Sequence, residues 1–206
     1  MNASRGRYRS ERLDLAWRLV ILAFWLLCLS GCAVKRDTSA RVRLDRGAKI
    51  DLSTFEGFGE PFAGLQRMVI QPNSGDPFRM QLAVEVEGDR HALVGLTPIG
   101  NRAFSIVLEE GRLRYEALPF FRLPVPAREL LGCWVLAHYP EEALRAEALS
   151  AKWTLETLAE EGRELRRFAD RHGVVLEIRI QGDPPERSRV RVIHYRKGYR
   201  IDFTSR

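Results

Sequence analysis

Apolar and polar side chains alternate along two blocks of this 206-residue chain, and a period of two is typical of β-strands with one buried face. The first block begins near Leu65, and turn residues such as Gly88-Asp89 and Glu110-Gly111 divide it. Because the turns are short, we expect an antiparallel meander. The strands expected in it are 78–87, 91–97, 102–109 and 112–117.

Between the two blocks the spacing changes to that of helices. The spacing predicts a helix from Ala127 to His138, which is apolar nearly all the way round and therefore needs burial on more than one side. A second short helix is expected from Glu141 to Leu149, with acidic residues at its start, where they favour the helix dipole.

The second block returns to a period of two and runs to the C-terminus. Strands are expected at 174–180, 190–194 and 199–204, with Val174, Leu176, Ile178 and Ile180 on the buried face. Two further strands, 152–157 and 164–168, compete with an alternative, a single helix across 155–171.

These elements predict an α+β fold: a curved antiparallel sheet, forming an open half-barrel, with short helices packed in its concave face. Two helices are few for so many strands, so the sheet must curve to cover its apolar face. Any unfilled concavity would be an apolar pocket, and the alternative is a filled core. The residues expected to line such a pocket are Leu82, Val84, Val86, Phe104, Ile106, Leu108, Leu130 and Trp134.

The N-terminus has the pattern of a secretory signal. Arginines precede an apolar run from Leu19 to Leu29, which is shorter than the roughly 20 residues of a membrane-spanning helix. The sequence Leu29-Ser30-Gly31-Cys32 then resembles the bacterial lipobox, which implies lipidation of Cys32. The alternatives are an ordinary signal peptide with an incidental cysteine, or a short membrane anchor.

This interpretation divides the chain into a lipoprotein signal peptide (1–31), a lipidated N-terminus and tether (32–64) and a sheet domain (65–206). Lipoproteins kept in the inner membrane usually have Asp after the lipidated cysteine. Because Ala33 stands there, the resemblance favours a lipid-anchored protein on the periplasmic face of the outer membrane. Multiple acyl chains give stable anchoring.

Charge and candidate chemistry narrow the function. The net charge is +6, of which the signal contributes five Arg less Glu11 and Asp14, or +3. The remaining arginines alternate with glutamates, which is typical of a solvated surface rather than a nucleic-acid site. No disulfide is possible in the mature chain, because Cys133 is left alone; it is either a small buried apolar residue or a catalytic thiol.

Motifs for catalysis, metals and cofactors are missing. The four histidines lack metal-ligand spacing, and no Gly-x-Ser-x-Gly motif occurs, so we expect no enzyme, metal or cofactor. His194 shares the inward parity of Val190 and Val192, and is either a polar group inside a pocket or a hydrogen-bonded histidine of the core or its rim.

Three segments resemble an uncharacterised family of bacterial lipoproteins: Leu93 to Phe104, Glu129 to Pro140, and Ile193-His194-Tyr195 with Tyr199 to Asp202. The resemblance implies a fold like that of the LolA/LolB lipoprotein carriers, whose unclosed barrel shelters acyl chains beneath helices. Some members of the family are encoded among genes for aryl polyene lipid synthesis.

The leading hypothesis is an outer-membrane lipoprotein that binds or shuttles an acyl or polyenyl lipid, or a lipoprotein, in envelope lipid transport. Its partners would be the membrane, through Cys32, and a hydrophobic ligand. The alternative is an interaction module that docks on an envelope protein complex, which predicts a filled core and an exposed apolar patch or strand edge. Nucleic acid is not expected as a partner.

Overall fold

The computed structural model describes residues 39–45, 48–55, 61–182 and 189–205. They lie within one compact unit, Thr38–Arg206. The predicted lipobox, Leu29, Ser30, Gly31 and Cys32, lies outside the described residues, so lipidation stays a prediction.

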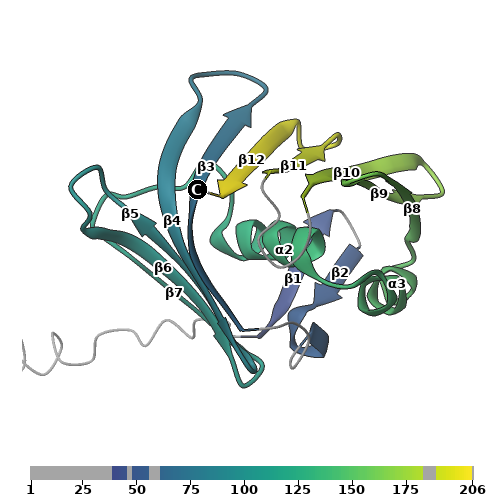
Figure 1. The fold of residues 1–206 in the computed structure, drawn as a ribbon, viewed down its shortest axis with the longest axis horizontal. Coiled ribbons are helices and arrows are strands. Elements are labelled where there is room, and N and C mark those ends of the chain that lie inside the picture. The colour runs from purple at the N-terminus through teal and green to yellow at the C-terminus, as the bar shows by residue number, and fades with distance from the viewer. Residues whose placement is uncertain (1–38, 46–47, 56–60, 183–188, 206) are drawn as a thin grey trace, which may run out of the picture. The chain divides into compact units, whose positions relative to one another are not determined.

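One antiparallel sheet of ten strands organises this unit, and Figure 1 shows it curving around helix α2. The strand order is β7-β6-β5-β4-β3-β12-β11-β10-β9-β8. The first five strands of the sheet are β3 (Phe62–Pro72), β4 (Phe78–Glu87), β5 (Arg90–Leu96), β6 (Arg102–Glu109) and β7 (Arg112–Ala117). The last five are β8 (Thr154–Glu160), β9 (Arg163–Asp170), β10 (Gly173–Gln181), β11 (Arg189–His194) and β12 (Tyr199–Ser205).

The chain builds this sheet as two meanders that meet at its centre. β3 to β7 run outward to one edge, and β8 to β12 return from the other edge, so that β12 pairs with β3, from Tyr199 opposite Pro72 to Ser205 opposite Gln66. Helices α2 (Ala127–His138) and α3 (Glu141–Ser150) carry the chain between the edges. The predicted α+β fold with an open antiparallel sheet is therefore confirmed.

Two details of the second meander concern the predictions: the first decides between two alternatives, and the second is a correction. Residues 155–171 form β8 and β9 rather than the alternative helix. Val174 was expected to face inward but is 39% exposed, because the register shifts between Val174 and Leu176 and turns the start of β10 over. Beyond this bulge Leu176, Ile178 and Ile180 are buried as predicted.

The largest difference concerns the expected tether. Residues 39–45 and 48–55 are not a linker: they contain β1 (Arg41–Asp45), β2 (Ala48–Asp51) and a 3-10 helix η1 (Leu52–Phe55), and are here termed the plug. The short alternating pattern of Val42, Leu44 and Ile50 was hidden among charged residues, yet all three side chains are completely buried. The plug belongs to the packed domain.

The plug, α2 and the concave face of the sheet share a single hydrophobic core. Figure 1 shows α2 between the sheet and the pair β1–β2. Every residue of α2 from Glu129 to Ala137 is buried, which confirms that this helix packs on more than one side. All the residues of this core lie within Thr38–Arg206, so that unit carries its own means of folding.

Candidate functional site

The residues predicted to line a pocket lie together on the inside of the sheet. They are Leu82, Val84, Val86, Phe104, Ile106, Leu108, Leu130 and Trp134, and all are buried within the common core. Leu82, Ile106, Leu108 and Leu130 are 0% exposed, so no space the size of a water molecule adjoins them. In this conformation the interior is filled by α2 and the plug, and a role of these residues in ligand binding stays a prediction.

Polar groups fix α2 at both ends inside this apolar interior. At its start the buried carboxylate of Glu129 accepts a hydrogen bond from the hydroxyl of Tyr199 and pairs with Lys197 at 2.5 Å. At its end Arg166, 2% exposed, donates to the carbonyl oxygens of Leu136 at 2.9 Å and Tyr139 at 2.7 Å. These bonds satisfy carbonyl groups that a helix leaves open at its C-terminus.

The plug packs tightly against α2 at a glycine. A Cβ atom on Gly132 would lie 3.1 Å from Val42 Cγ1 and 3.2 Å from Leu44 Cδ2, so the absence of a side chain allows this approach. On its other flank, His194 Nε2 donates to the carbonyl oxygen of Leu44 at 2.7 Å. His194 is thus a hydrogen-bonded core residue, which decides between the two interpretations of the sequence.

Cys133 has the environment of a structural residue and not of a nucleophile. Its side chain is completely buried, and its Sγ atom lies 3.6 Å from the hydroxyl of Tyr199. Burial raises the pKa of the Cys133 thiol to about 12, so the thiolate is not formed near neutral pH. The same burial raises the pKa of Tyr199, and the neighbouring Glu129 adds to the shift.

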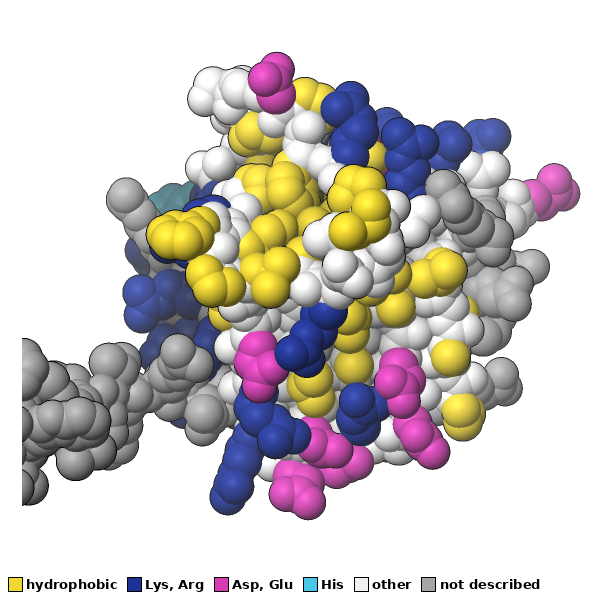
Figure 2. Space-filling model, turned by 90° about the vertical axis from the view of Figure 1, so that its left-hand side faces the viewer, with side chains coloured by type: hydrophobic (Ala, Val, Ile, Leu, Met, Phe, Trp, Pro, Cys, Tyr) yellow, Lys and Arg dark blue, Asp and Glu magenta, His cyan; other side chains and the backbone are white. Residues whose placement is uncertain are grey.

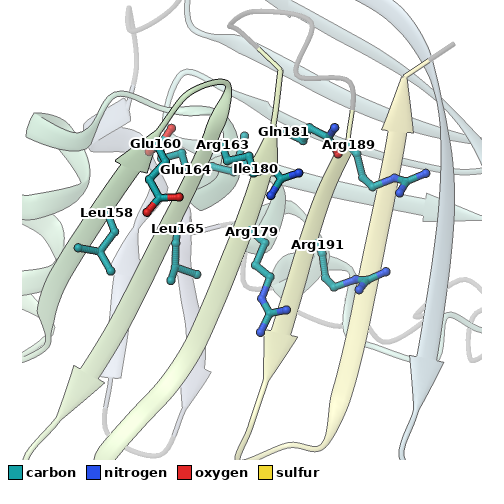
Figure 3. A pocket seen from close by; sticks show the side chains of 10 residues that line it. All are labelled: Leu158, Glu160, Arg163, Glu164, Leu165, Arg179, Ile180, Gln181, Arg189 and Arg191. Atoms are coloured by element: carbon teal, nitrogen blue, oxygen red, sulfur yellow. The ribbon is translucent and has the colours of Figure 1, made fainter.

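A second candidate site lies on the outer face of the sheet, over β8 to β11 (Figure 3). It is a pocket of about 450 Å³ that no sequence pattern predicted. Four arginines, two leucines and two glutamates dominate its lining, which comprises Leu158, Glu160, Arg163, Glu164, Leu165, Arg179, Ile180, Gln181, Arg189 and Arg191.

Ion pairs neutralise only part of this pocket. Arg191 pairs with Asp202 at 2.6 Å, and Arg179 pairs with Glu177 at 2.8 Å. Burial alone would raise the pKa of Glu177, but hydrogen bonds from Arg179 and Arg167 outweigh it, so that this pKa lies below its ordinary value. The lining residues alone, four arginines with Glu160 and Glu164, carry a net charge of +2, which Glu177 and Asp202 balance from outside the lining.

A third feature is an apolar tip at the end of the sheet where β5 and β7 end and β6 begins. Ile99, 83% exposed, stands in the turn between β5 and β6, and Phe120, 93% exposed, follows β7. The amide of Leu118 donates to Ala103 O at 2.9 Å, which ties the segment after β7 to β6. Figure 2 shows hydrophobic side chains gathered on the face that carries this end of the sheet. Here Ile99, Leu118 and Phe120 are termed the apolar tip.

The backbone at Phe120 has a positive φ, which is unusual for a residue other than glycine. Phe121 N donates to Leu118 O at 3.1 Å, closing a turn with Pro119 in its second position and Phe120, at φ 67°, in its third. Such turns favour glycine in the third position because side chains strain this conformation. Beneath the turn, Phe121 packs on Phe104 with 5.5 Å between ring centroids, so the turn is fixed in place.

Among the described residues, no group of three His, Cys, Asp or Glu side chains could hold a metal ion. None of the helices in this part of the chain is long and apolar enough to cross a membrane.

A family model matches residues 64–206, from β3 to the end of the chain, and therefore covers nearly all of the ten-stranded sheet and both helices. The chain belongs to the DUF3261 family. Members of this family are described as proteins of unknown function. The DUF3261 match begins after the plug, so the family model includes the open sheet but not residues 39–55 that fill it. A comparison with curated proteins finds no match.

Two solved structures are similar to this DUF3261 protein. One, a LolA superfamily protein from Nitrosomonas europaea, has a TM-score of 0.41 and 8% identity, over 76% of this chain and 89% of that chain. The other, a putative outer membrane lipoprotein-sorting protein domain from Vibrio parahaemolyticus, has a TM-score of 0.38 and 12% identity, over 73% and 84%. The fold class rests on the sheet topology itself.

Sequence reasoning missed both surface sites for physical reasons. The pocket depends on which strands become neighbours, since Arg179 and Arg191 meet only through the pairing of β10 with β11. The tip left a weak signal, because Pro119-Phe120 reads as a turn but not as an exposed one.

Proposed function

We propose that this protein is an envelope lipoprotein that shelters the acyl or polyenyl chain of a lipid or lipoprotein between its sheet and α2. The chain would take the place that the plug occupies here. One observation carries the proposal: among the described residues the plug forms its own two-stranded sheet and shares no strand ladder with the ten-stranded one. Among the described residues, a single isolated backbone bridge, Ser39 to Arg112, pairs the two, and side-chain bonds such as that from His194 to Leu44 add to it.

In this proposal the plug would leave the interior without breaking a strand ladder of the main sheet. Its departure would expose five completely buried side chains, which are Val42, Leu44, Ile50, Leu52 and Phe55. At about 2 kcal/mol for each, their burial contributes about 10 kcal/mol. A chain of roughly 14 methylene groups, at about 0.8 kcal/mol each, contributes a similar amount. An acyl chain thus matches the plug in apolar burial, although it would not replace the plug's polar bonds, such as those from His194 and Arg196.

The short link before the plug supports a position near a membrane. Cys32 and Ser39 are separated by residues 33–38, and six extended residues reach at most about 20 Å. If Cys32 is lipidated as its lipobox predicts, the domain stays close to the bilayer surface. Release of the plug would lengthen this link, so that anchoring and opening of the interior are coupled.

A reversible disulfide between plug and helix tests the proposal. A Cβ atom on Gly132 would lie 3.7 Å from Val42 Cβ, within the range of disulfides. The variant is Val42→Cys with Gly132→Cys, in a Cys133→Ala background and in residues 33–206, which contain the whole compact unit. Binding of cis-parinaric acid, a fluorescent polyene fatty acid, is measured with the disulfide oxidised and reduced.

We expect the reduced protein to bind the probe and the oxidised protein to lose binding by at least about tenfold. The reduced form of the same variant is the control for the substitutions themselves. Equal binding by both forms would place the ligand elsewhere, and no binding by either the reduced variant or the unsubstituted protein would contradict the proposal.

The second candidate function is a docking module for an envelope protein complex. The filled core and the apolar tip favour it, because both are expected of an interaction protein. Crosslinking in cells tests it. Docking is supported if the unsubstituted protein crosslinks to a single protein partner and Phe120→Ala abolishes this crosslink. Failure of the substitution to change the crosslinked products would contradict it.

A further inference from the structure

The pocket on the outer face of β8 to β11 is a binding site of its own, separate from the interior. We propose that it binds the phosphate headgroup of an anionic amphiphile, with arginines holding the phosphate and Leu158 and Leu165 contacting the first carbons of its tail. The inference does not rest on the proposed function, since the core lies on the opposite face of the same strands.

Strand register places these side chains in two adjacent rows. In one row Leu158 is opposite Leu165, Leu165 opposite Arg179, and Arg179 opposite Arg191. In the next row the order is Glu160, Arg163, Gln181 and Arg189. In the first row, therefore, leucines lie over β8 and β9 and arginines over β10 and β11, whereas the second row places Glu160 and Arg163 over β8 and β9 (Figure 3).

Among the described residues, two of the four arginines in the lining have carboxylate partners: Arg179 pairs with Glu177 and Arg191 with Asp202. Arg179 and Arg191 are directly opposite across the β10–β11 pair, where like charges destabilise a sheet. Arg189 lies two residues from Arg191 on the same face, and adds a third positive charge. In the described part of the chain neither Arg163 nor Arg189 forms an ion pair, so a bound anion would give these two arginines a partner.

The chemistry of both ends selects the ligand. Guanidinium groups match phosphate oxygens in pairs of hydrogen bonds and are the usual choice for phosphate recognition. Leu158 lies two strands from Arg179 in the same row and is 50% exposed, so its side chain is open to contact with the first carbons of a tail. A volume of about 450 Å³ accommodates a headgroup with a short stretch of hydrocarbon. A free phosphate would use the arginines alone.

Soluble short-chain lipids test this site in residues 33–206. Dihexanoyl phosphatidic acid, dihexanoyl phosphatidylcholine and inorganic phosphate are titrated below the micelle concentration by calorimetry. We expect phosphatidic acid to bind at least about tenfold more tightly than the other two. Arg179→Gln with Arg189→Gln should remove this binding, and Leu158→Ser should weaken the lipid but not the phosphate.

The matched control is Arg102→Gln with Arg114→Gln, which removes the same charge from exposed arginines of β6 and β7. Loss of binding in this control as well would reduce the effect to overall charge and overturn the proposal. Equal affinity for phosphate and lipid would overturn the role of the leucines. The disulfide-locked plug variant should bind phosphatidic acid normally, and loss of binding there would assign the lipid to the interior instead.

Discussion

The two faces of the strands β9 to β11 differ in their burial and in the partners of their charged side chains. On the inner face, Phe168, Ile178 and Val192 are completely buried, and the one cation, Arg166, has hydrogen-bond partners on three sides. On the outer face, Arg179 opposes Arg191 with like charge. The inner face is explained by folding alone, whereas on the outer face Arg163 and Arg189 form no ion pair among the described residues.

This contrast separates residues that hold the structure from residues free to serve binding. Substitutions on the inner face should reduce stability, and those on the outer face should change stability little while altering binding. The apolar tip resembles the outer face in that its residues do not stabilise the fold, because Phe120 combines a strained backbone with nearly full exposure. The following predictions test the contrast, beginning with the largest expected effect.

Arg166→Ala should destabilise the fold most strongly. It removes the Arg166 hydrogen bonds from the carbonyl oxygens of Leu136 and Tyr139 in a buried setting and takes one cationic partner from Glu164. We expect the free energy of unfolding to fall by about 3 to 5 kcal/mol, measured by urea denaturation. The exposed Arg114, which pairs with Glu109, is the control, and Arg114→Ala should cost at most about 1 kcal/mol. Similar losses in both variants would contradict the contrast.

A pH-dependent loss of stability of intermediate size is expected at His194. Its Nε2 donates to Leu44, and its Nδ1 accepts from the amide of Lys197 at 3.3 Å, so the folded state holds the neutral ring. Burial lowers the pKa of His194 below the ordinary 6.5. Above that value both states are neutral. Below it the unfolded chain binds a proton that the folded chain excludes, so stability falls as pH falls.

Urea unfolding between about pH 7.5 and about pH 5 measures this effect, for which we expect a loss on the order of 1 kcal/mol. His91, whose pKa is also lowered chiefly by burial, contributes in the same direction. His194→Gln should flatten the dependence, and His172→Gln, on an exposed residue, should leave it unchanged. A slope that His194→Gln does not alter would assign the effect to other groups.

The sequence revealed the inner face far better than the outer one. Local periodicity placed β4, β6 and α2, because burial on one side forces apolar residues to recur at fixed spacing. It failed at the plug, whose strands are short, and at Val174, where a bulge reverses the parity. The arginine pocket arises from pairing between strands, which no local pattern records. The lipobox remains a strong sequence pattern that the described residues do not test.

At the apolar tip we expect a substitution to leave stability equal or raise it slightly, in contrast to the losses expected at Arg166 and His194. Phe120→Gly relieves a positive φ and removes a ring that is 93% exposed, so the free energy of unfolding should stay equal or rise by up to about 1 kcal/mol. Phe120→Ala removes the ring but keeps the strain, and should gain nothing. Both variants should lose crosslinking to an envelope partner, which would separate a contact made by the ring from a structural role. A loss of stability in Phe120→Gly would mean that the ring packs after all.

The smallest change in stability is expected for Arg179→Gln. The test is therefore how the stability of each protein depends on salt. Arg179→Gln removes the repulsion from Arg191 but also the ion pair with Glu177, which retains Arg167 at 3.2 Å. The two effects oppose each other, so the free energy of unfolding should change by less than about 0.5 kcal/mol. Because salt screens exposed charges, stability of the unsubstituted protein should rise between low and high salt, and this rise should be smaller in Arg179→Gln. Urea unfolding at two salt concentrations measures it. If both proteins respond equally to salt, the arginines of the outer face do not repel one another, and the main reason for assigning an anionic ligand to them is lost.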